Sequence, residues 1–207
     1  LDLFFTSTIK DDIRVLFYRN IQERVENVAP FLMLDHEPYV TIIDGRIKWI
    51  QDAYTVSYRY PYSQPKKLGR GRRLNYIRNS VKAVVDAYDG TISLYIWDEK
   101  DPMIQTYAKM FPKLFKKRSE ASESLKWHVR YPKDLFRIQA EMYESFHMTD
   151  PRVWYNQEDK WNIAAELAEK TIGRTQQVPS KTAPQRGGRK PAPVKARQKN
   201  RMSPYYM

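Results

Sequence analysis

Two aspartates occupy similar places in this sequence, each shortly after a tryptophan in a segment rich in β-branched residues. Asp52 follows Trp49, and Asp98 directly follows Trp97. Two carboxyl groups can perform acid and base catalysis on a bond between them when roughly 5 to 9.5 Å separates them. Aspartates at strand ends more often cap turns or accept backbone hydrogen bonds. The pair therefore supports a carboxylate-dependent hydrolase as one hypothesis and a structural role as the other.

Other catalytic and metal-binding signals are weak. His36, His128 and His147 are the only histidines, and they lack the spacing of a metal motif such as HExxH. We interpret them as surface or helix-capping residues. No G-x-S-x-G elbow occurs, and Gly69 and Gly71 lack the third glycine of a nucleotide-binding loop. The sequence thus predicts no catalytic residue, metal or cofactor, and it favours a non-enzymatic protein without excluding an enzyme.

A tyrosine-rich segment has the most unusual local composition. Tyr58, Tyr60 and Tyr62 alternate along the chain, with Arg59 between the first two. Alternate residues of extended backbone share one face. Tyrosine combines a rigid apolar body with a polar tip, which suits stacking on sugars or aromatic groups and equally suits a half-buried loop. We take these four residues as binding candidates for an envelope ligand or a protein partner.

A basic loop follows the tyrosines and contains Lys66, Lys67, Arg70, Arg72 and Arg73. We interpret it as a solvated loop whose cations are anion-binding candidates. Anionic lipid is the partner expected for a domain beside a membrane, where each cation near the surface adds roughly 1 kcal/mol. Nucleic acid would use the same charge, but no helix-turn-helix, RNP or zinc-finger pattern is present. A nonspecific nucleic-acid-binding module is therefore the less favoured alternative.

The net charge of +12 is distributed unevenly. The range from Gly173 to Arg201 holds nine Lys or Arg and no acidic residue, which leaves +3 for the rest. Proline, glycine and glutamine replace large apolar residues there, so little burial offsets the entropy of ordering the backbone. We predict a single domain over residues 1–172, a flexible basic linker over 173–202 and the start of a further strand over 203–207.

Two hairpins define the expected sheet. Tyr39–Ile43 and Arg46–Gln51 flank Asp44-Gly45, and the segment from Asn75 to Glu99 folds back at Asp89-Gly90. Aspartate followed by glycine supplies the positive φ that tight hairpin turns require. The sequence therefore predicts an α+β fold, in which helices pack on an antiparallel sheet of at least four strands and a disordered basic tail follows.

Helix signals occur before and after the hairpins. Apolar residues from Ile13 to Val28, among them Phe17, recur at helical spacing after a capping box at Thr8. Asp101-Pro102 and Asp150-Pro151 each place a capping side chain before a proline at the first helical position. We predict further helices over 132–147 and 161–171, because the first has an apolar side and the second is rich in Ala, Leu and Glu.

Three stretches carry a resemblance to a known family. They are Pro30–Gln64, which contains DAYTVSYRYPYSQ, Asn75–Glu99, which begins NYIRNSVKAVVDAYDG, and Tyr131–Trp161. Together they resemble bacterial multi-pass membrane proteins of uncharacterised protein family 0182, in which a bundle of amino-terminal membrane helices precedes a large extracytoplasmic region. The resemblance implies that this chain is a part of that region, outside the plasma membrane. It implies no activity.

The preferred function is therefore a non-enzymatic extracytoplasmic domain of an integral membrane protein, which scaffolds the assembly or binds an envelope ligand through the tyrosines. The expected partners are the rest of its own membrane-spanning chain, an envelope polymer, anionic lipid or another membrane protein. The chain has no cysteine, which excludes disulfides and thiolate chemistry within it.

Overall fold

The computed structural model describes residues 17–67, 73–165 and 201–205. The chain forms two units that divide after Gln139, within one helix. Most of the predicted linker over 173–202 and the last two residues of the predicted strand over 203–207 lie outside the described residues. Along the part of the chain that is described, no helix combines the length and the apolar character that crossing a membrane requires.

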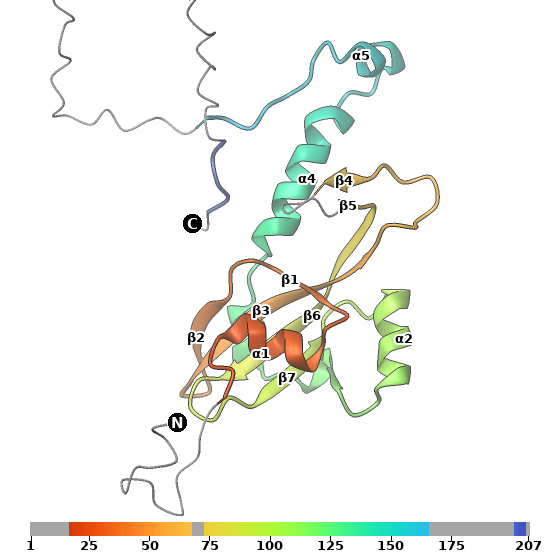
Figure 1. The fold of residues 1–207 in the computed structure, drawn as a ribbon. Coiled ribbons are helices and arrows are strands. Elements are labelled where there is room, and N and C mark those ends of the chain that lie inside the picture. Colours follow the sequence, from red (N-terminus) through yellow and green to blue (C-terminus); the bar gives the residue numbers. More distant parts are fainter. Residues whose placement is uncertain (1–16, 68–72, 166–200, 206–207) are drawn as a thin grey trace, which may run out of the picture. The chain divides into compact units, whose positions relative to one another are not determined.

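A six-stranded sheet forms the centre of the first unit (Figure 1). Its long central strands, β3 (Arg46–Ser57) and β6 (Tyr76–Asp86), pair antiparallel along most of their length. Beyond β6 lie β7 (Ile92–Ile96), which is antiparallel to it, and β8 (Phe115–Lys117), which is parallel to β7. The predicted α+β fold with an antiparallel sheet of at least four strands is confirmed, and the parallel strand is an addition to it.

Both predicted hairpins are present. β2 (Tyr39–Ile43) turns into β3 through Asp44 and Gly45, whose φ angles are 51° and 73°. Strands β6 and β7 are joined by residues 87–91, in which Gly90 has a φ of 71°. Because glycine adopts positive φ without steric cost, both Asp-Gly pairs mark the places where the chain reverses.

The first described helix, α1 (Ile21–Val28), begins later than predicted. Its N-cap is Asn20, whose side-chain oxygen accepts hydrogen bonds from two backbone amides of the first turn. Tyr18 has a φ of 52°, which lies outside the right-handed helical region. The prediction that the helix includes Phe17 is therefore wrong, and the part predicted before Phe17 lies outside the described residues.

Three later helices agree with the sequence. α2 (Pro102–Met110) and α5 (Pro151–Asn156) begin at the two Asp-Pro pairs, and α4 (Lys133–Phe146) matches the prediction over 132–147. The short helix α3 (Glu123–His128) and the 3-10 turn η3 (Arg118–Glu120) have no counterpart among the predictions.

The predicted helix over 161–171 is absent from its described part, 161–165. The backbone N–H of Trp161 donates to the carbonyl oxygen of Glu144 at 3.0 Å, and its ring stacks on His147 with 3.8 Å between centroids. Ala165 forms an antiparallel bridge with Arg201. These contacts within the second unit outweigh the local helix propensity.

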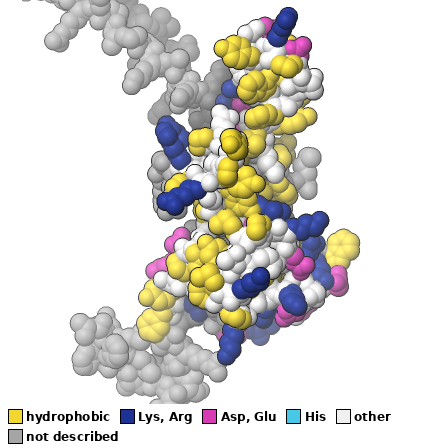
Figure 2. All heavy atoms as spheres, turned by 90° about the vertical axis from the view of Figure 1, so that its right-hand side faces the viewer, with side chains coloured by type: hydrophobic (Ala, Val, Ile, Leu, Met, Phe, Trp, Pro, Cys, Tyr) yellow, Lys and Arg dark blue, Asp and Glu magenta, His cyan; other side chains and the backbone are white. Residues whose placement is uncertain are grey.

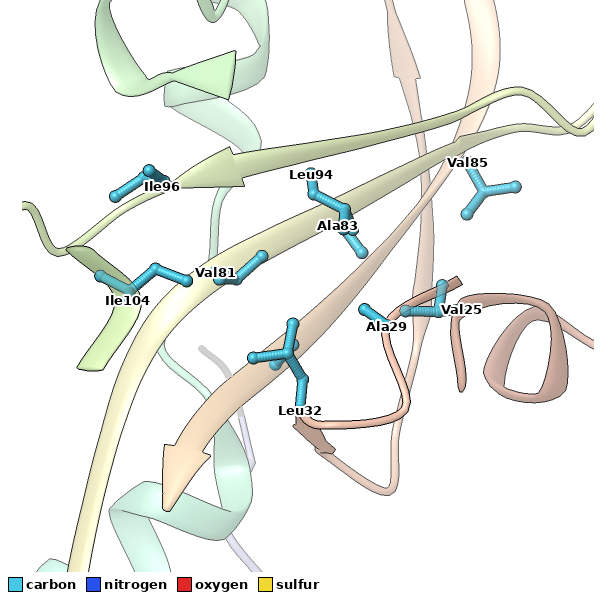
Figure 3. Packing of buried hydrophobic residues seen from close by; sticks show 10 residues of the cluster. Val25, Ala29, Leu32, Val81, Ala83, Val85, Leu94, Ile96 and Ile104 are labelled. Carbon is cyan, nitrogen blue, oxygen red and sulfur yellow. The ribbon is translucent and has the colours of Figure 1, made fainter. Parts of the chain in front are cut away.

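The sheet is buried on both faces, which makes the first unit three layers deep. One face packs against α1, α2 and the segment that leads from α1 into the edge strand β1 (Met33–Leu34), which pairs with β3 (Figure 3). The buried residues of that layer are Val25, Ala29, Leu32, Ala53, Val81, Ala83, Val85, Leu94, Ile96 and Ile104. The other face packs against α3 and the turn before it, through Ile43, Ile50, Val84, Ala121 and Leu125. Strands β3 and β6 are therefore buried continuously at their centres.

One buried carboxylate attaches α2 to the sheet. Asp101 is the N-cap of α2 and accepts from the Met103 amide at 3.0 Å. It also accepts from the hydroxyls of Thr55 and Ser80, each at 2.5 Å, and of Tyr76 at 2.6 Å. Burial raises the pKa of Asp101, but these hydrogen bonds outweigh burial and hold the pKa below its usual value.

We expect Asp101→Ala to lower the free energy of unfolding by about 2–4 kcal/mol, because it removes a helix cap and leaves buried hydroxyls without an acceptor. Since the folded-state pKa is lowered, this stabilisation is complete above the unfolded pKa of about 4 and is lost as the pH falls further. Urea unfolding of both proteins between pH 3 and 7 measures it.

The matched control is Asp150→Ala, which removes the equivalent cap of α5. Asp150 accepts only from backbone amides, those of Arg152 and Val153. We expect a cost of about 1 kcal/mol there. Equal losses at the two positions would show that the hydroxyl contacts of Asp101 contribute nothing.

Candidate functional site

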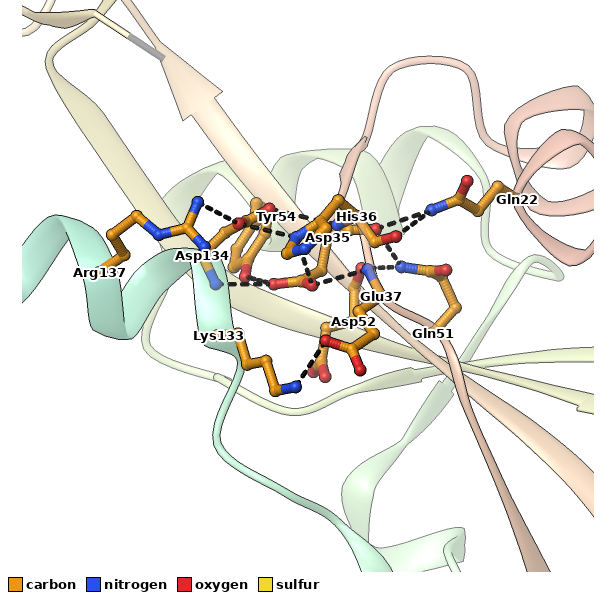
Figure 4. A network of polar contacts seen from close by, with 10 residues as sticks. All are labelled: Gln22, Asp35, His36, Glu37, Gln51, Asp52, Tyr54, Lys133, Asp134 and Arg137. Carbon is orange, nitrogen blue, oxygen red and sulfur yellow. Dashed lines mark hydrogen bonds and ion pairs between the residues drawn. The ribbon is translucent and has the colours of Figure 1, made fainter. Parts of the chain in front are cut away.

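A polar network surrounds Asp35, directly after β1 (Figure 4). The side chain is 2% exposed, and its two oxygens accept from the Tyr54 hydroxyl at 2.5 Å and the backbone amides of Glu37 at 3.0 Å and Asp134 at 3.1 Å. Its carbonyl oxygen accepts from the side-chain amide of Gln51 at 2.7 Å. Asp35 thus joins the start of α4 to β3.

Tyr54 reaches Asp35 because of an irregularity in β3. The register with β6 shifts between Ala53 and Thr55, and Tyr54 is fully buried at this point. Burial raises the pKa of the Tyr54 hydroxyl far above its usual value, and the bond to Asp35 raises it further. The hydroxyl therefore stays protonated and serves as a hydrogen-bond donor.

Asp35, His36 and Asp134 together resemble a set of metal ligands. One ligand atom of each lies within 4.8 Å of the others. His36 Nδ1 is 2.9 Å from Asp134 Oδ1, and the His36 amide donates to Asp134 Oδ2 at 3.2 Å. The oxygens of Asp35 already accept three protein donors. The contacts given by the structure therefore describe a clamp at the start of α4.

A buried ion pair lies on the central strands. Lys82 of β6 contacts Asp52 of β3, and their side chains are 2% and 3% exposed. Asn79 Nδ2 also donates to Asp52 at 2.9 Å, and Lys82 donates to the carbonyl oxygen of Arg130 at 3.2 Å. Burial raises the pKa of Asp52 and lowers that of Lys82, while the opposite charge of each partner reduces both shifts.

The two aspartates of the hydrolase hypothesis have different partners. Asp52 is held by Lys82 and Asn79, whereas Asp98 forms an ion pair of 2.5 Å with Arg78 and accepts from a backbone amide. Asp98 lines a surface pocket whose lining does not include Asp52. In this arrangement both carboxylates have structural roles.

Two neighbouring pockets share Trp97 and Lys126 in their walls. The larger, of about 610 Å³, has mixed charge: its lining is Trp97, Asp98, Glu99, Lys100, Arg118, Ser119, Glu123 and Lys126. The smaller, of about 370 Å³, contains three cationic side chains and no carboxylate: its lining is Asn79, Lys82, Trp97, Lys126, Val129, Arg130, Tyr131 and Pro132. The guanidinium of Arg118 lies 4.5 Å from the Trp97 ring centre.

The tyrosine candidates lie beyond the end of β3. Tyr58, Tyr60 and Tyr62 are each more than half exposed. The guanidinium carbon of Arg59 lies 5.1 Å from the centre of the Tyr58 ring. The Tyr60 ring stacks on that of Tyr76, with 5.4 Å between the ring centres. Tyr62 has a φ of 57° in a turn, so the segment is not one regular extended strand. The four candidates thus share a loop, and their role in binding stays a prediction.

The basic loop is described only at its two ends. Lys66 and Lys67 form β4 (Lys66–Lys67), and Arg73 lies in β5 (Arg73–Leu74), which pairs with it. Arg70 and Arg72 lie outside the described residues.

The other two histidines lie at helix ends. His128 Nδ1 is 2.7 Å from the carbonyl oxygen of Ser124, and His147 Nδ1 is 2.9 Å from that of Tyr143. Both contacts reach four residues back along the chain, to the last turn of a helix.

The sequence reasoning missed Asp35, Tyr54 and Lys82 as partners. Lys82 carried a usable signal, because a lysine within the apolar run VKAVV needs a buried counter-charge. Pairing β3 with β6 would have brought Asp52 opposite to it. The bonds of Asp35 carried no such signal, since they join positions up to 99 residues apart.

Comparison with known proteins places the chain in a family. The model of an uncharacterised protein family (UPF0182) matches residues 1–207. UPF0182 proteins of Methanospirillum hungatei, Trichodesmium erythraeum and Desulfitobacterium hafniense are 51%, 47% and 52% identical to it. These alignments cover 84%, 82% and 81% of this chain but 20%, 20% and 17% of the relatives. The chain therefore spans about a fifth of their length. No solved structure matches it.

We expect Lys82→Met to lower the free energy of unfolding by about 3–5 kcal/mol, because it leaves Asp52 buried without its counter-charge. Adding Asp52→Asn to this variant should recover part of the loss. The double variant should therefore lose less than the sum of the two single variants in urea unfolding. Lys109→Met, at an exposed site on α2, is the control and should change stability by less than about 0.5 kcal/mol. Strict additivity would contradict the pairing.

Proposed function

The chain belongs to the uncharacterised protein family UPF0182, and from this premise we propose that it is a non-enzymatic packing domain of a longer integral membrane protein, held on the extracytoplasmic side. The observation that carries the proposal is an exposed apolar surface on the second unit. In its preferred form, the domain scaffolds the assembly by packing against the rest of its own chain.

This surface, which we call the α4–α5 surface, consists of large side chains that are 40–81% exposed. Its members are Met142, Tyr143, Phe146, Trp154, Tyr155 and Trp161. Some of these rings lie close to one another, as do those of Phe146 and Trp154, whose centres are 6.1 Å apart. Each side chain nevertheless stays at least 40% exposed to solvent. Figure 2 shows hydrophobic side chains gathered at the surface on this face of the molecule. Large apolar side chains exposed in such number on one short stretch of chain mark contact sites.

The rest of the same polypeptide is the occupant that we propose. The alignments with this chain cover 20% of two of the relatives, so most of a family member is available to cover this surface. Tyrosine and tryptophan suit such contacts because they combine large apolar area with a polar group. An envelope polymer or a second membrane protein at Tyr58, Tyr60 and Tyr62 remains a further proposal for the loop after β3.

The buried carboxylates support a structural role. Asp35 accepts bonds from α4 and β3, Asp52 neutralises Lys82, and Asp101 caps α2. Each of these carboxylates holds elements of the first unit together, which agrees with a domain whose role is to pack against other parts of the protein.

Sidedness tests the location. In the full-length protein without native cysteines, we expect Asn27→Cys, on the exposed side of α1, to react with a membrane-impermeant maleimide in intact cells. Val25→Cys, on the buried side of the same helix, is the matched control and should not react before unfolding. Reaction of the Asn27 variant only after lysis would overturn the extracytoplasmic assignment.

Coverage of the α4–α5 surface is tested by the same chemistry. Tyr155 is 81% exposed. We therefore expect Tyr155→Cys to react as fast as Asn27→Cys in the 207-residue chain but at least about tenfold more slowly in the full-length protein, because burial of a site excludes the reagent. Equal rates at both positions in the full-length protein would remove the packing role.

A further inference from the structure

We propose that the smaller of the two pockets beside Trp97, at the junction of β6, α3 and the start of α4, binds a phosphate group. This inference concerns the first unit alone and does not depend on the packing role of the α4–α5 surface or on the side of the membrane.

Positive charge in this pocket is concentrated. Lys82, Lys126 and Arg130 line it, and no carboxylate does. Each of these cations also has a partner within the protein: Lys82 pairs with the almost fully buried Asp52, and Lys126 pairs at 2.7 Å with Glu123, whose side chain is 78% exposed. The guanidinium of Arg130 lies 4.8 Å from the centre of the Tyr39 ring. The protein around the pocket has a lower dielectric constant than water, so the attraction between a bound dianion and these cations is stronger than it would be in solution.

The ammonium of Lys82 supplies a hydrogen-bond donor for a ligand. Its ammonium has three hydrogens, and the structure gives it two acceptors, Asp52 Oδ1 and the carbonyl oxygen of Arg130. The residue is 2% exposed and belongs to the pocket lining. A buried ammonium is stabilised by each additional acceptor, so a ligand oxygen at the third hydrogen completes its coordination.

Asn79 adds an acceptor to the same lining. Its Oδ1 is buried and has no hydrogen-bond partner among the described residues, while its Nδ2 donates to Asp52. Monohydrogen phosphate and its esters fit this combination, because they present acceptor oxygens to the lysines and carry one hydroxyl, or a neighbouring hydroxyl of the esterified group, that can donate to Asn79. A volume of about 370 Å³ accommodates the phosphate together with a small organic group.

Lys126→Gln is the informative variant, because Lys126 is on the surface of α3 and its recorded partner is the exposed Glu123. Lys126→Arg keeps the charge. Lys109→Gln removes the same charge from the exposed side of α2 and is the matched control. The probe is inorganic phosphate added to the 207-residue chain at constant ionic strength. The readout is the Trp97 indole N–H resonance, assigned with Trp97→Phe.

We expect a saturable shift of the Trp97 resonance with phosphate and none with an equal concentration of chloride. Lys126→Gln should raise the dissociation constant for phosphate about tenfold, and Lys109→Gln should leave it unchanged. Lys126→Arg should have a dissociation constant within about threefold of that of the original chain. The proposal would be overturned if the shift did not saturate, or if Lys109→Gln raised the dissociation constant as much as Lys126→Gln does.

A second arm separates a soluble phosphate ester from a lipid headgroup. Glycerol phosphate should compete with inorganic phosphate for the Trp97 shift. The same chain is then mixed with vesicles of phosphatidylglycerol. If Lys126→Gln binds these vesicles as tightly as the original chain does, and glycerol phosphate does not change the Trp97 resonance, the pocket is not a phosphate site and the lipid binds elsewhere.

Discussion

The continuous burial of the β3–β6 strand pair is the constraint on which the rest of the structure depends. Helices cover both faces of this pair at its centre, so polar side chains there have no access to water and need partners inside the protein. Asp52 with Lys82, Thr55 and Ser80 with Asp101, and Tyr54 with Asp35 meet this need. Asp101 thereby fixes α2 against the sheet, and Asp35, which also accepts from the Asp134 amide, fixes the segment after β1 and the start of α4.

Much of the fold could be predicted because its signals are local. An Asp-Gly pair reverses the chain through its own φ angles, and an Asp-Pro pair starts a helix through its own side chain and ring. Where the outcome depends on distant residues, the sequence failed. Trp161 has a helical neighbourhood in sequence but stacks on His147 of the same unit. The helix predicted through Phe17 failed for a local reason instead, because Tyr18 has a positive φ and Asn20 caps a helix that begins at Ile21.

The candidate sites divide in the same way. Tyr58, Tyr60 and Tyr62 were visible as a local composition, and they are indeed exposed. The phosphate pocket was not visible, because Lys82, Trp97 and Lys126 come from three separate segments, a strand, a loop and a helix, whose packing no spacing rule gives. The same buried strand pair that needs Asp52 as a counter-charge also places Lys82 in the lining of that pocket. Stability of the sheet and the proposed binding chemistry therefore share one residue.

We propose that this family member is a packing domain whose exposed α4–α5 surface is covered in the longer protein. Hydrogen exchange of the backbone amides in the isolated chain and in the full-length protein tests it most directly, because protection reports coverage without any substitution. The account predicts equal, strong protection of β3 and β6 in both proteins and a large gain in protection of α4 and α5 in the full-length protein. Unchanged exchange in α4 and α5 would contradict it.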